Sequence, residues 1–139
     1  MKAIRPIKFR GKDNHGKWRE GCYVKFDGLQ GAIYYPIYHR VQGDEFKVVR
    51  TDWCYVDEET VGQFTGLRDK NGRDIYEGDI LEVNYADEES YLEVRFVRGV
   101  FAFLWNGDLD DEFPCNAPTH EWARVVGNIY DNPELIRKR

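Results

Sequence analysis

The clearest pattern in this sequence is a strict alternation of apolar and polar residues in its second half. Within residues 91–97 every second side chain is apolar, as Leu92 and Val94 illustrate. The same alternation recurs over residues 81–85. A period of two places successive side chains on opposite faces of an extended chain. Both segments are therefore predicted to be strands with one buried and one exposed face.

The next segment is apolar on both faces. Residues Val100–Trp105 contain no polar side chain except the indole N–H of Trp105, which is the pattern of a central strand. Between this segment and the preceding one stands Arg98-Gly99, which is typical of a tight hairpin turn.

The first half of the chain contains shorter apolar runs that are rich in β-branched and aromatic residues, which favour strands. The candidate strands there are Ile4–Arg10, Gly21–Phe26, Ala32–Tyr38, Glu45–Arg50 and Trp53–Val56. Helix signals are few. Residues 119–124 fit one turn of helix, and Asn132-Pro133 fits an N-cap followed by proline at the first helical position. Only short helices are expected.

Turn residues punctuate the chain at regular intervals. Asn71-Gly72 is a strong turn signal because both residues tolerate positive φ. Regular turns between short strands favour bent sheets or barrels. We therefore predict a mainly β protein of bent antiparallel sheets, or of small SH3-like or barrel-like lobes, with at most short helices. One domain is expected over 1–139, with an irregular β sub-lobe at 1–65 and a β-meander or barrel sub-lobe at 66–139.

Composition narrows the class of protein. The chain has 139 residues, of which 15% are aromatic, and a net charge of -5. The aromatic content indicates a globular core, and the acidic balance argues against general coating of nucleic acid. The first twelve residues carry repeated charges instead of a signal peptide's apolar run, and no segment approaches a membrane span. The cysteines Cys22, Cys54 and Cys115 are too scattered for a disulfide framework. A cytoplasmic protein without a membrane partner is expected.

Three blocks of sequence stand out together. The first is Ile7–Lys12 with Trp18 and Gly21 after it, the second is the long stretch Thr60–Leu81, and the third is Val125–Leu135. This arrangement, over about residues 4 to 136, closely resembles the YopX family of bacteriophage and prophage proteins. It departs mildly from the family pattern at Phe64, where tyrosine is frequent, and at Gly11, where a small residue is usual.

The resemblance implies a small, β-rich, cytoplasmic protein of a phage or prophage in a bacterial host cell. It brings no catalytic residues, because the family has no established activity. Read from the residues alone, Gly62, Gly66, Gly72 and Gly78 stand where chain reversals or close backbone approach would require glycine. Apolar anchors lie between them. The long second block is therefore interpreted chiefly as a folding signature rather than an active site.

Known catalytic and cofactor patterns find little support. Gly11-Lys12-Asp13 lacks the earlier glycine and the hydroxyl of a phosphate-binding loop. The cysteines and histidines lack zinc-ligand spacing. A nucleophilic pair of Cys115 and His120 could be drawn, but no orienting group is visible for it. We expect a protein that is not an enzyme and that needs no cofactor and no metal.

Acidic clusters leave one alternative open. They occur at residues 57–59, 87–89 and 108–112, and paired carboxylates can hold Mg²⁺ or transfer protons. Each cluster falls at a predicted turn, where solvated charges are common. A metal-dependent hydrolase is therefore the least favoured of the functions considered.

A row of basic residues near the N-terminus is a candidate contact for nucleic acid. Lys8 and Arg10 would share one face of a strand, and Lys12 continues the row. Such a row could contact phosphates while Trp18 stacks on a base. The opposing interpretation is a charged edge strand that blocks aggregation, and the acidic net charge favours it.

A tyrosine-rich segment is the candidate contact for protein. It contains Tyr34, Tyr35 and Tyr38, and aromatic side chains are enriched in protein interfaces. The leading hypothesis is therefore a non-catalytic protein-binding or homo-oligomeric assembly module, whose partner is a host protein or a second copy of the chain. Nucleic-acid binding through the N-terminal row is the alternative.

Overall fold

The structure is a computed structural model. It describes residues 6–40, 43, 46–85, 88–115 and 118–136. Strands make up 58% of the chain and helices 8%, and among the described residues no helix reaches seven residues. The predicted mainly β fold with only short helices is confirmed. The chain divides into two compact units, residues 1–63 (unit 1) and 64–139 (unit 2).

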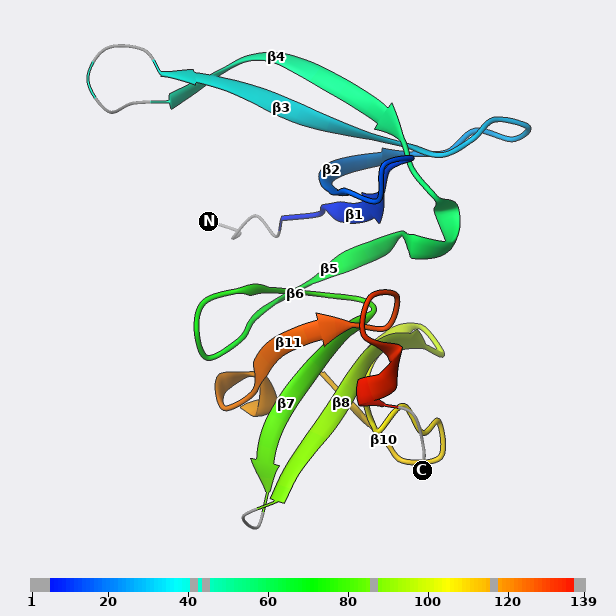
Figure 1. The fold of residues 1–139 in the computed structure, drawn as a ribbon, viewed down its shortest axis with the longest axis vertical. Coiled ribbons are helices and arrows are strands. Elements are labelled where there is room, and N and C mark those ends of the chain that lie inside the picture. Colours follow the sequence, from blue (N-terminus) through cyan, green and yellow to red (C-terminus); the bar gives the residue numbers. More distant parts are fainter. Residues whose placement is uncertain (1–5, 41–42, 44–45, 86–87, 116–117, 137–139) are drawn as a thin grey trace. The chain divides into compact units, whose positions relative to one another are not determined.

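Unit 1 is an antiparallel sheet built from successive hairpins (Figure 1). Its elements are β1 (Phe9–Lys12), β2 (Trp18–Val24), β3 (Ala32–Arg40), β4 (Phe46–Tyr55) and the short 3-10 helix η1 (Glu58–Thr60). The strand order is β4-β3-β2-β1, and the first residues of β5 (Gly62–Arg68) pair with β1 on its other side. β4 is therefore an edge strand.

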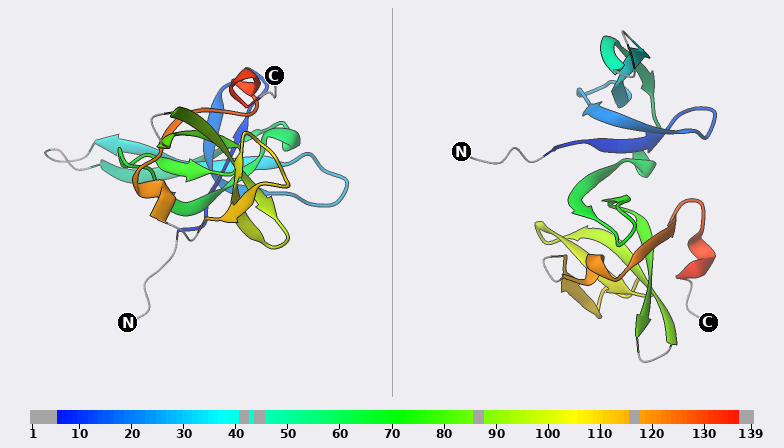
Figure 2. Two further views of the ribbon diagram at one scale, coloured as in Figure 1. Left: turned by 90° about the horizontal axis from the view of Figure 1, so that it is seen from below. Right: turned by 90° about the vertical axis from the view of Figure 1, so that its left-hand side faces the viewer.

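Unit 2 contains the remainder of β5 and a curved antiparallel meander (Figures 1 and 2). Its other elements are β6 (Asp74–Tyr76), β7 (Asp79–Tyr85), β8 (Glu88–Val97), β9 (Val100–Trp105), β10 (Glu112–Pro114), β11 (Arg124–Asn128) and the 3-10 helices η2 (Pro118–Glu121) and η3 (Pro133–Leu135). β6 pairs with β5, and the meander has the order β10-β9-β8-β7-β11. Neither of the two sheets closes into a barrel.

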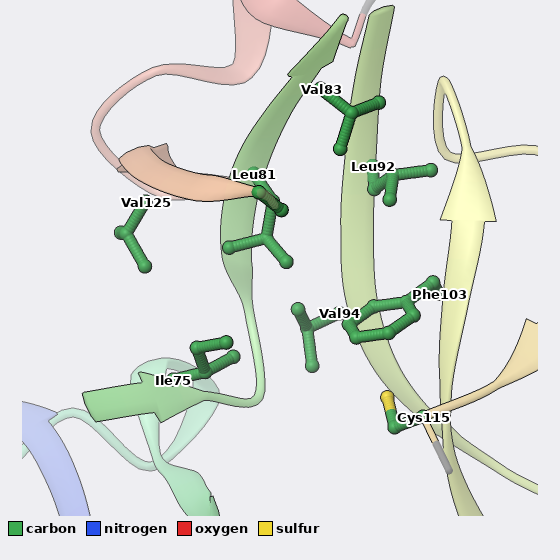
Figure 3. Close-up of a cluster of buried hydrophobic side chains, with 9 residues drawn as sticks. Ile75, Leu81, Val83, Leu92, Val94, Phe103, Cys115 and Val125 are labelled. Atoms are coloured by element: carbon green, nitrogen blue, oxygen red, sulfur yellow. The ribbon is translucent and has the colours of Figure 1, made fainter. Parts of the chain in front are cut away.

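Most of the buried apolar side chains of the described residues belong to unit 2. One cluster gathers side chains from β6, β7, β8, β9 and β11 (Figure 3). Its members are Ile75, Leu81, Val83, Leu92, Val94, Phe103, Cys115, Ala123 and Val125. The alternation seen in the sequence explains this core, since Leu92 and Val94 of β8 both point inward and are fully buried.

Unit 1 has a thinner core. Among its described residues the buried apolar side chains are Ala32, Ile33 and Val56, of which Ile33 and Val56 are completely buried. Burial of apolar surface is the main favourable term in folding, so this sheet gains less from side-chain packing than the meander does. Much of its aromatic content lies at the surface instead.

One predicted strand appears with its predicted bounds, and a predicted turn and a predicted short helix appear in place. β9 covers Val100–Trp105 as expected. Arg98 and Gly99 both have positive φ, 47° and 83°, as a tight two-residue hairpin turn requires. Pro133 opens η3, but Asn132 makes no side-chain cap to that helix.

Other elements differ from their predicted bounds. The strand predicted at Ile4–Arg10 is β1, which begins at Phe9; residues 1–5 lie outside the described part. The separate strands predicted at Glu45–Arg50 and Trp53–Val56 are one strand, β4, because β3 pairs along its whole length. An irregularity between Ile37 and Tyr38 absorbs one extra residue of β4.

Candidate functional site

The second sequence block contains a turn in which the carboxylate of Asp69 accepts hydrogen bonds from two segments of the chain. The Oδ1 atom of Asp69 accepts hydrogen bonds from the backbone N–H groups of Asn71 and Arg73, each at 2.9 Å. Its Oδ2 atom accepts one from the N–H of Val125 on β11, at 2.8 Å. Burial by itself would raise the pKa of Asp69, but these backbone donors hold the pKa below its ordinary value. Asp69 therefore ties the turn to β11.

The second half of the same block forms another fastened turn, between β6 and β7. The N–H of Tyr76 donates to Oδ2 of Asp79 at 2.8 Å, and Asp79 is almost completely buried. Gly78 donates its N–H to the carbonyl of Val94 and accepts from the N–H of Ile129. This turn is thereby attached both to β8 and to the segment after β11.

The third block is a turn organised by two asparagines. Oδ1 of Asn128 accepts from the N–H groups of Tyr130 and Asp131, at 3.0 and 2.9 Å. Oδ1 of Asn132 accepts from the N–H of Asn128 at 3.2 Å. A Cβ atom at Gly127 would lie 2.3 Å from that same Oδ1 atom, so only glycine fits there. These polar residues of the second and third blocks therefore have a structural role, since their side chains bind backbone groups of the turns.

A continuous row of exposed aromatic rings lies on one side of the β3–β4 hairpin. Tyr34 stands opposite Trp53, and their rings are stacked with centroids 6.1 Å apart. The rings of Trp53 and Tyr55 are arranged edge to face, with their centroids 5.0 Å apart. Tyr38 lies on the same side as Tyr34, because alternate residues of a strand share a face. The exposed fractions are 38% for Tyr34, 46% for Trp53, 45% for Tyr55 and 57% for Tyr38. These four residues are called the aromatic face below.

The aromatic face is free of charged side chains over the described stretches 32–38 and 51–55. The other residues on that side in these stretches are Ala32, Pro36 and Thr51. The one charged residue within them, Asp52, alternates with the aromatic positions and so lies on the opposite side of the sheet. The face is therefore an apolar and hydroxyl-bearing surface.

The third predicted tyrosine, Tyr35, lies on the other side of the sheet. It is half-buried, and the guanidinium of Arg19 lies over its ring at 5.0 Å. Arg19 in turn pairs with Asp13 at 3.1 Å. The structure thus brings Tyr34 and Tyr38 to one surface and separates Tyr35 from them.

Two residues of the predicted basic row, Arg10 and Lys12, lie against one tryptophan. Lys12 stands opposite Trp18 in the β1–β2 register, and its ammonium group lies 5.4 Å from the ring centroid. The guanidinium of Arg10 lies over the same ring at 4.7 Å, and Arg10 is only 7% exposed. Lys8 precedes β1 and is half-buried. Arg10 and Lys12 therefore make cation–π contacts with Trp18.

Sequence reasoning missed Trp53 and Tyr55 as site residues. Their own alternation with Asp52 and Cys54 signals one face of a strand. What the sequence could not supply is the register that sets Trp53 opposite Tyr34, because strand register depends on the whole sheet.

The family model described as "YopX protein" matches residues 8–137. This match covers nearly the whole chain and includes the second and third sequence blocks in full. The chain belongs to the YopX family. The predicted resemblance is confirmed.

Two solved structures are similar to this YopX-family chain. One is the crystal structure of protein EF1440 from Enterococcus faecalis, with 27% identity and a TM-score of 0.59, covering 96% of this chain and 100% of that one. The other is protein yopX from Bacillus subtilis, with 19% identity and a TM-score of 0.49, covering 95% of this chain and 97% of that one. A search of curated proteins gave no match.

The acidic cluster at residues 57–59 of this YopX-family chain organises loops. Oδ1 of Asp57 accepts the N–H of Glu59 at 3.1 Å and caps η1. Glu58 pairs with Lys25 at 2.9 Å and accepts the N–H of Gly31 at 2.7 Å. The ion pair with Lys25, and then the bond from Gly31, lower the pKa of Glu58. These residues line an open hollow of about 830 Å³ in unit 1. The carboxylates of Asp57 and Glu58 bind backbone N–H groups of the surrounding loops.

The remaining candidates for chemistry do not converge. In the described part of the YopX-family chain, no group of three or more His, Cys, Asp or Glu side chains could hold a metal ion. The three cysteines are free thiols. Burial raises the pKa of Cys115 to about 12, so this thiol stays protonated at neutral pH. His120, the other residue of the nucleophilic pair considered in the sequence, is half-buried and follows Cys115 in the chain.

Within the residues that the structure describes, no helix has the length and apolar character needed to cross a bilayer.

Proposed function

We propose that this YopX-family protein is a non-catalytic protein-binding module whose contact surface is the aromatic face. The observation that carries the proposal is the continuous row of Tyr34, Trp53 and Tyr55, whose rings touch one another yet remain more than a third exposed. The core of a protein interface is enriched in tyrosine and tryptophan and depleted in charge. Such residues also supply most binding hot spots.

The absence of charge on this face favours a protein partner over nucleic acid. Binding of single strands combines stacking rings with neighbouring cations that follow the phosphates. The aromatic face has no cation on its side within stretches 32–38 and 51–55. The predicted cations Arg10 and Lys12 lie against Trp18 on β1 and β2. The strand registers put this cluster on the same side of the sheet as Tyr34, but the acidic Glu20 stands between Trp18 and Cys22, the residue opposite Tyr34. An uncharged partner surface with apolar side chains is the best match.

The biological setting is part of the proposal. Membership in the YopX family supports a small protein of phage or prophage type that works in the cytoplasm of a bacterial host cell. The partner is accordingly proposed to be a host protein, or another protein of the same phage.

The test is affinity capture from host lysate, followed by mass spectrometry, with matched variants. W53A removes the central ring of the face and should lower the amount of the captured partner at least about tenfold, as expected for a hot spot. The same substitution should change the free energy of unfolding by less than about 1 kcal/mol, because the ring is exposed.

The matched control is F26A. Phe26 is 64% exposed in unit 1, lies in the loop between β2 and β3 and is not one of the four residues of the aromatic face. This variant should capture the partner as well as the unchanged protein does. Equal capture by W53A would refute the proposal. Recovery of nucleic acid that is released as salt rises would favour the alternative based on Lys8, Arg10, Lys12 and Trp18.

A further inference from the structure

The outer edge of β4 carries backbone groups directed away from the sheet. In the described part of the chain, β4 pairs with β3 alone. The N–H of Val56 donates inward to the carbonyl of Gly31, whereas the N–H of Trp53 donates to the carboxylate of Asp52 at 2.9 Å. Because backbone groups alternate in direction along a strand, Thr51 and Trp53 present their N–H and C=O groups outward. Beyond Tyr55 this side is occupied, since Val56 bridges to Asp13 and the N–H of Asp57 donates to Lys12. An edge of this kind is a template for another strand.

The charges along this edge are arranged to match a second copy of themselves. Arg50 and Asp52 flank Thr51 and carry opposite charges. In an antiparallel pair of two β4 strands centred on Thr51, Arg50 of each copy stands opposite Asp52 of the other. Opposite charges at directly opposed positions stabilise a strand pair, and a two-fold axis repeats the match.

We infer that two copies of this chain pair through their β4 edges, antiparallel and centred on Thr51. In this register the outward N–H and C=O groups of Thr51 bond to those of Thr51 in the second copy. Directly opposed residues lie on the same side of a sheet. The aromatic faces of the two copies therefore lie on one side of the joined sheet.

The length of this edge predicts a weak dimer. Val49 is the extra residue of the irregularity in β4, and the N–H of Trp53 is already bonded to Asp52, which limits regular pairing to about residues 50–52. The few hydrogen bonds available there should give a dimer that dissociates on dilution. This inference goes beyond the proposed function and uses the strand edge, a surface distinct from the aromatic face.

The experiment is sedimentation velocity over a range of protein concentrations. The unchanged chain should show a monomer–dimer equilibrium. R50E and D52R each place like charges opposite one another, and each should weaken the dimer about tenfold or more. An equimolar mixture of R50E and D52R, and the double variant R50E/D52R, should both regain the affinity of the unchanged chain, because each restores opposed opposite charges.

Two further variants separate the interface from folding and from net charge. T51P removes the outward N–H at the two-fold axis, where proline is tolerated on an edge strand, and should abolish dimerisation while circular dichroism stays unchanged. K17E makes the same change of charge at an exposed residue of the β1–β2 turn and should dimerise normally.

A chain that is monomeric at every concentration would overturn the inference, as would a dimer that T51P and the single charge variants leave intact. Neither result would affect partner capture by the aromatic face, so a failure here is distinguishable from a failure of the proposed function.

Discussion

At the scale of single residues, a few short polar side chains bind the backbone of the turns in unit 2. Asp69, Asp79 and Asn128 each accept backbone N–H groups that would otherwise lack a partner in a turn. A hydrogen bond to a charged group contributes about 1.5–3 kcal/mol, and a buried donor left without its acceptor costs a similar amount. This explains why Asp, Asn and Gly recur at the turns of the two longest sequence blocks.

The first prediction concerns Asp69. D69N should lower the free energy of unfolding by about 2–3 kcal/mol, because an amide nitrogen in place of one oxygen cannot accept from a backbone N–H. Urea denaturation measures this. The matched control is D110N, which changes an exposed acid whose own backbone N–H donates to Asp108 and should be nearly neutral.

The same residue predicts a pH dependence. The folded pKa of Asp69 lies below the ordinary value of 3.8, so its stabilising contribution is complete above that value and is lost as the pH falls through the folded pKa. D69N should therefore lose less stability between pH 5 and pH 3 than the unchanged protein. An identical acid slope in the two proteins would contradict the assigned role.

At the scale of elements, β4 shows where sequence patterns stop being sufficient. Thr51 and Asp52 interrupt the apolar pattern and predict a break between two strands. Pairing with β3 carries the strand through both residues, since a backbone ladder does not depend on side-chain polarity at an edge. By contrast, β9 was predictable because its apolar run and its turn residues both mark the same ends.

The strands β5, β6, β10 and β11 show a second limit. They are short or contain glycine, so alternation has little length over which to appear. The asparagine that was predicted to cap η3 shows a third limit of prediction from sequence. Asn132 precedes η3 as predicted, but its side chain bonds to the N–H of Asn128 instead of capping the helix. Local propensity cannot reveal a competing partner in the preceding turn.

A prediction at this scale concerns the turn after β11. G127A places a methyl group against the side chain of Asn132, at 2.3 Å from Oδ1, and should lower the free energy of unfolding by about 2–3 kcal/mol. In the background of N132A the same substitution should cost less than about 1 kcal/mol, because Oδ1 and Cγ, the two closest atoms, are gone and only Cβ remains at 3.0 Å. A double-mutant cycle in urea measures the difference. Additive effects would show that close approach is not the reason for glycine there.

At the scale of the whole molecule, charge and aromatic surface are unevenly distributed. Residues 1–63 contain eleven Lys and Arg against nine Asp and Glu, whereas residues 64–139 contain nine against sixteen. The net charge of -5 thus arises entirely in unit 2. Unit 1 combines a thin core with the exposed aromatic face, which is the reverse of what core packing alone would select.

The candidate site could be predicted from the sequence only in part. The segment containing Tyr34 and Tyr38 stands out by composition. Its partners Trp53 and Tyr55 lie on another strand, and their inclusion depends on a register fixed by long-range pairing. The separation of Tyr35 follows from alternation along β3 and was open to prediction once the strand was assigned.

The most direct test of the central claim is oxidative footprinting of the protein in complex with its captured partner, by hydroxyl radicals and mass spectrometry. Tyr34, Trp53 and Tyr55 should be labelled readily in the free protein and protected in the complex, while Phe26 stays equally reactive in both. Protection that is confined to Trp18 and its neighbours, with the aromatic face still fully reactive, would contradict the claim.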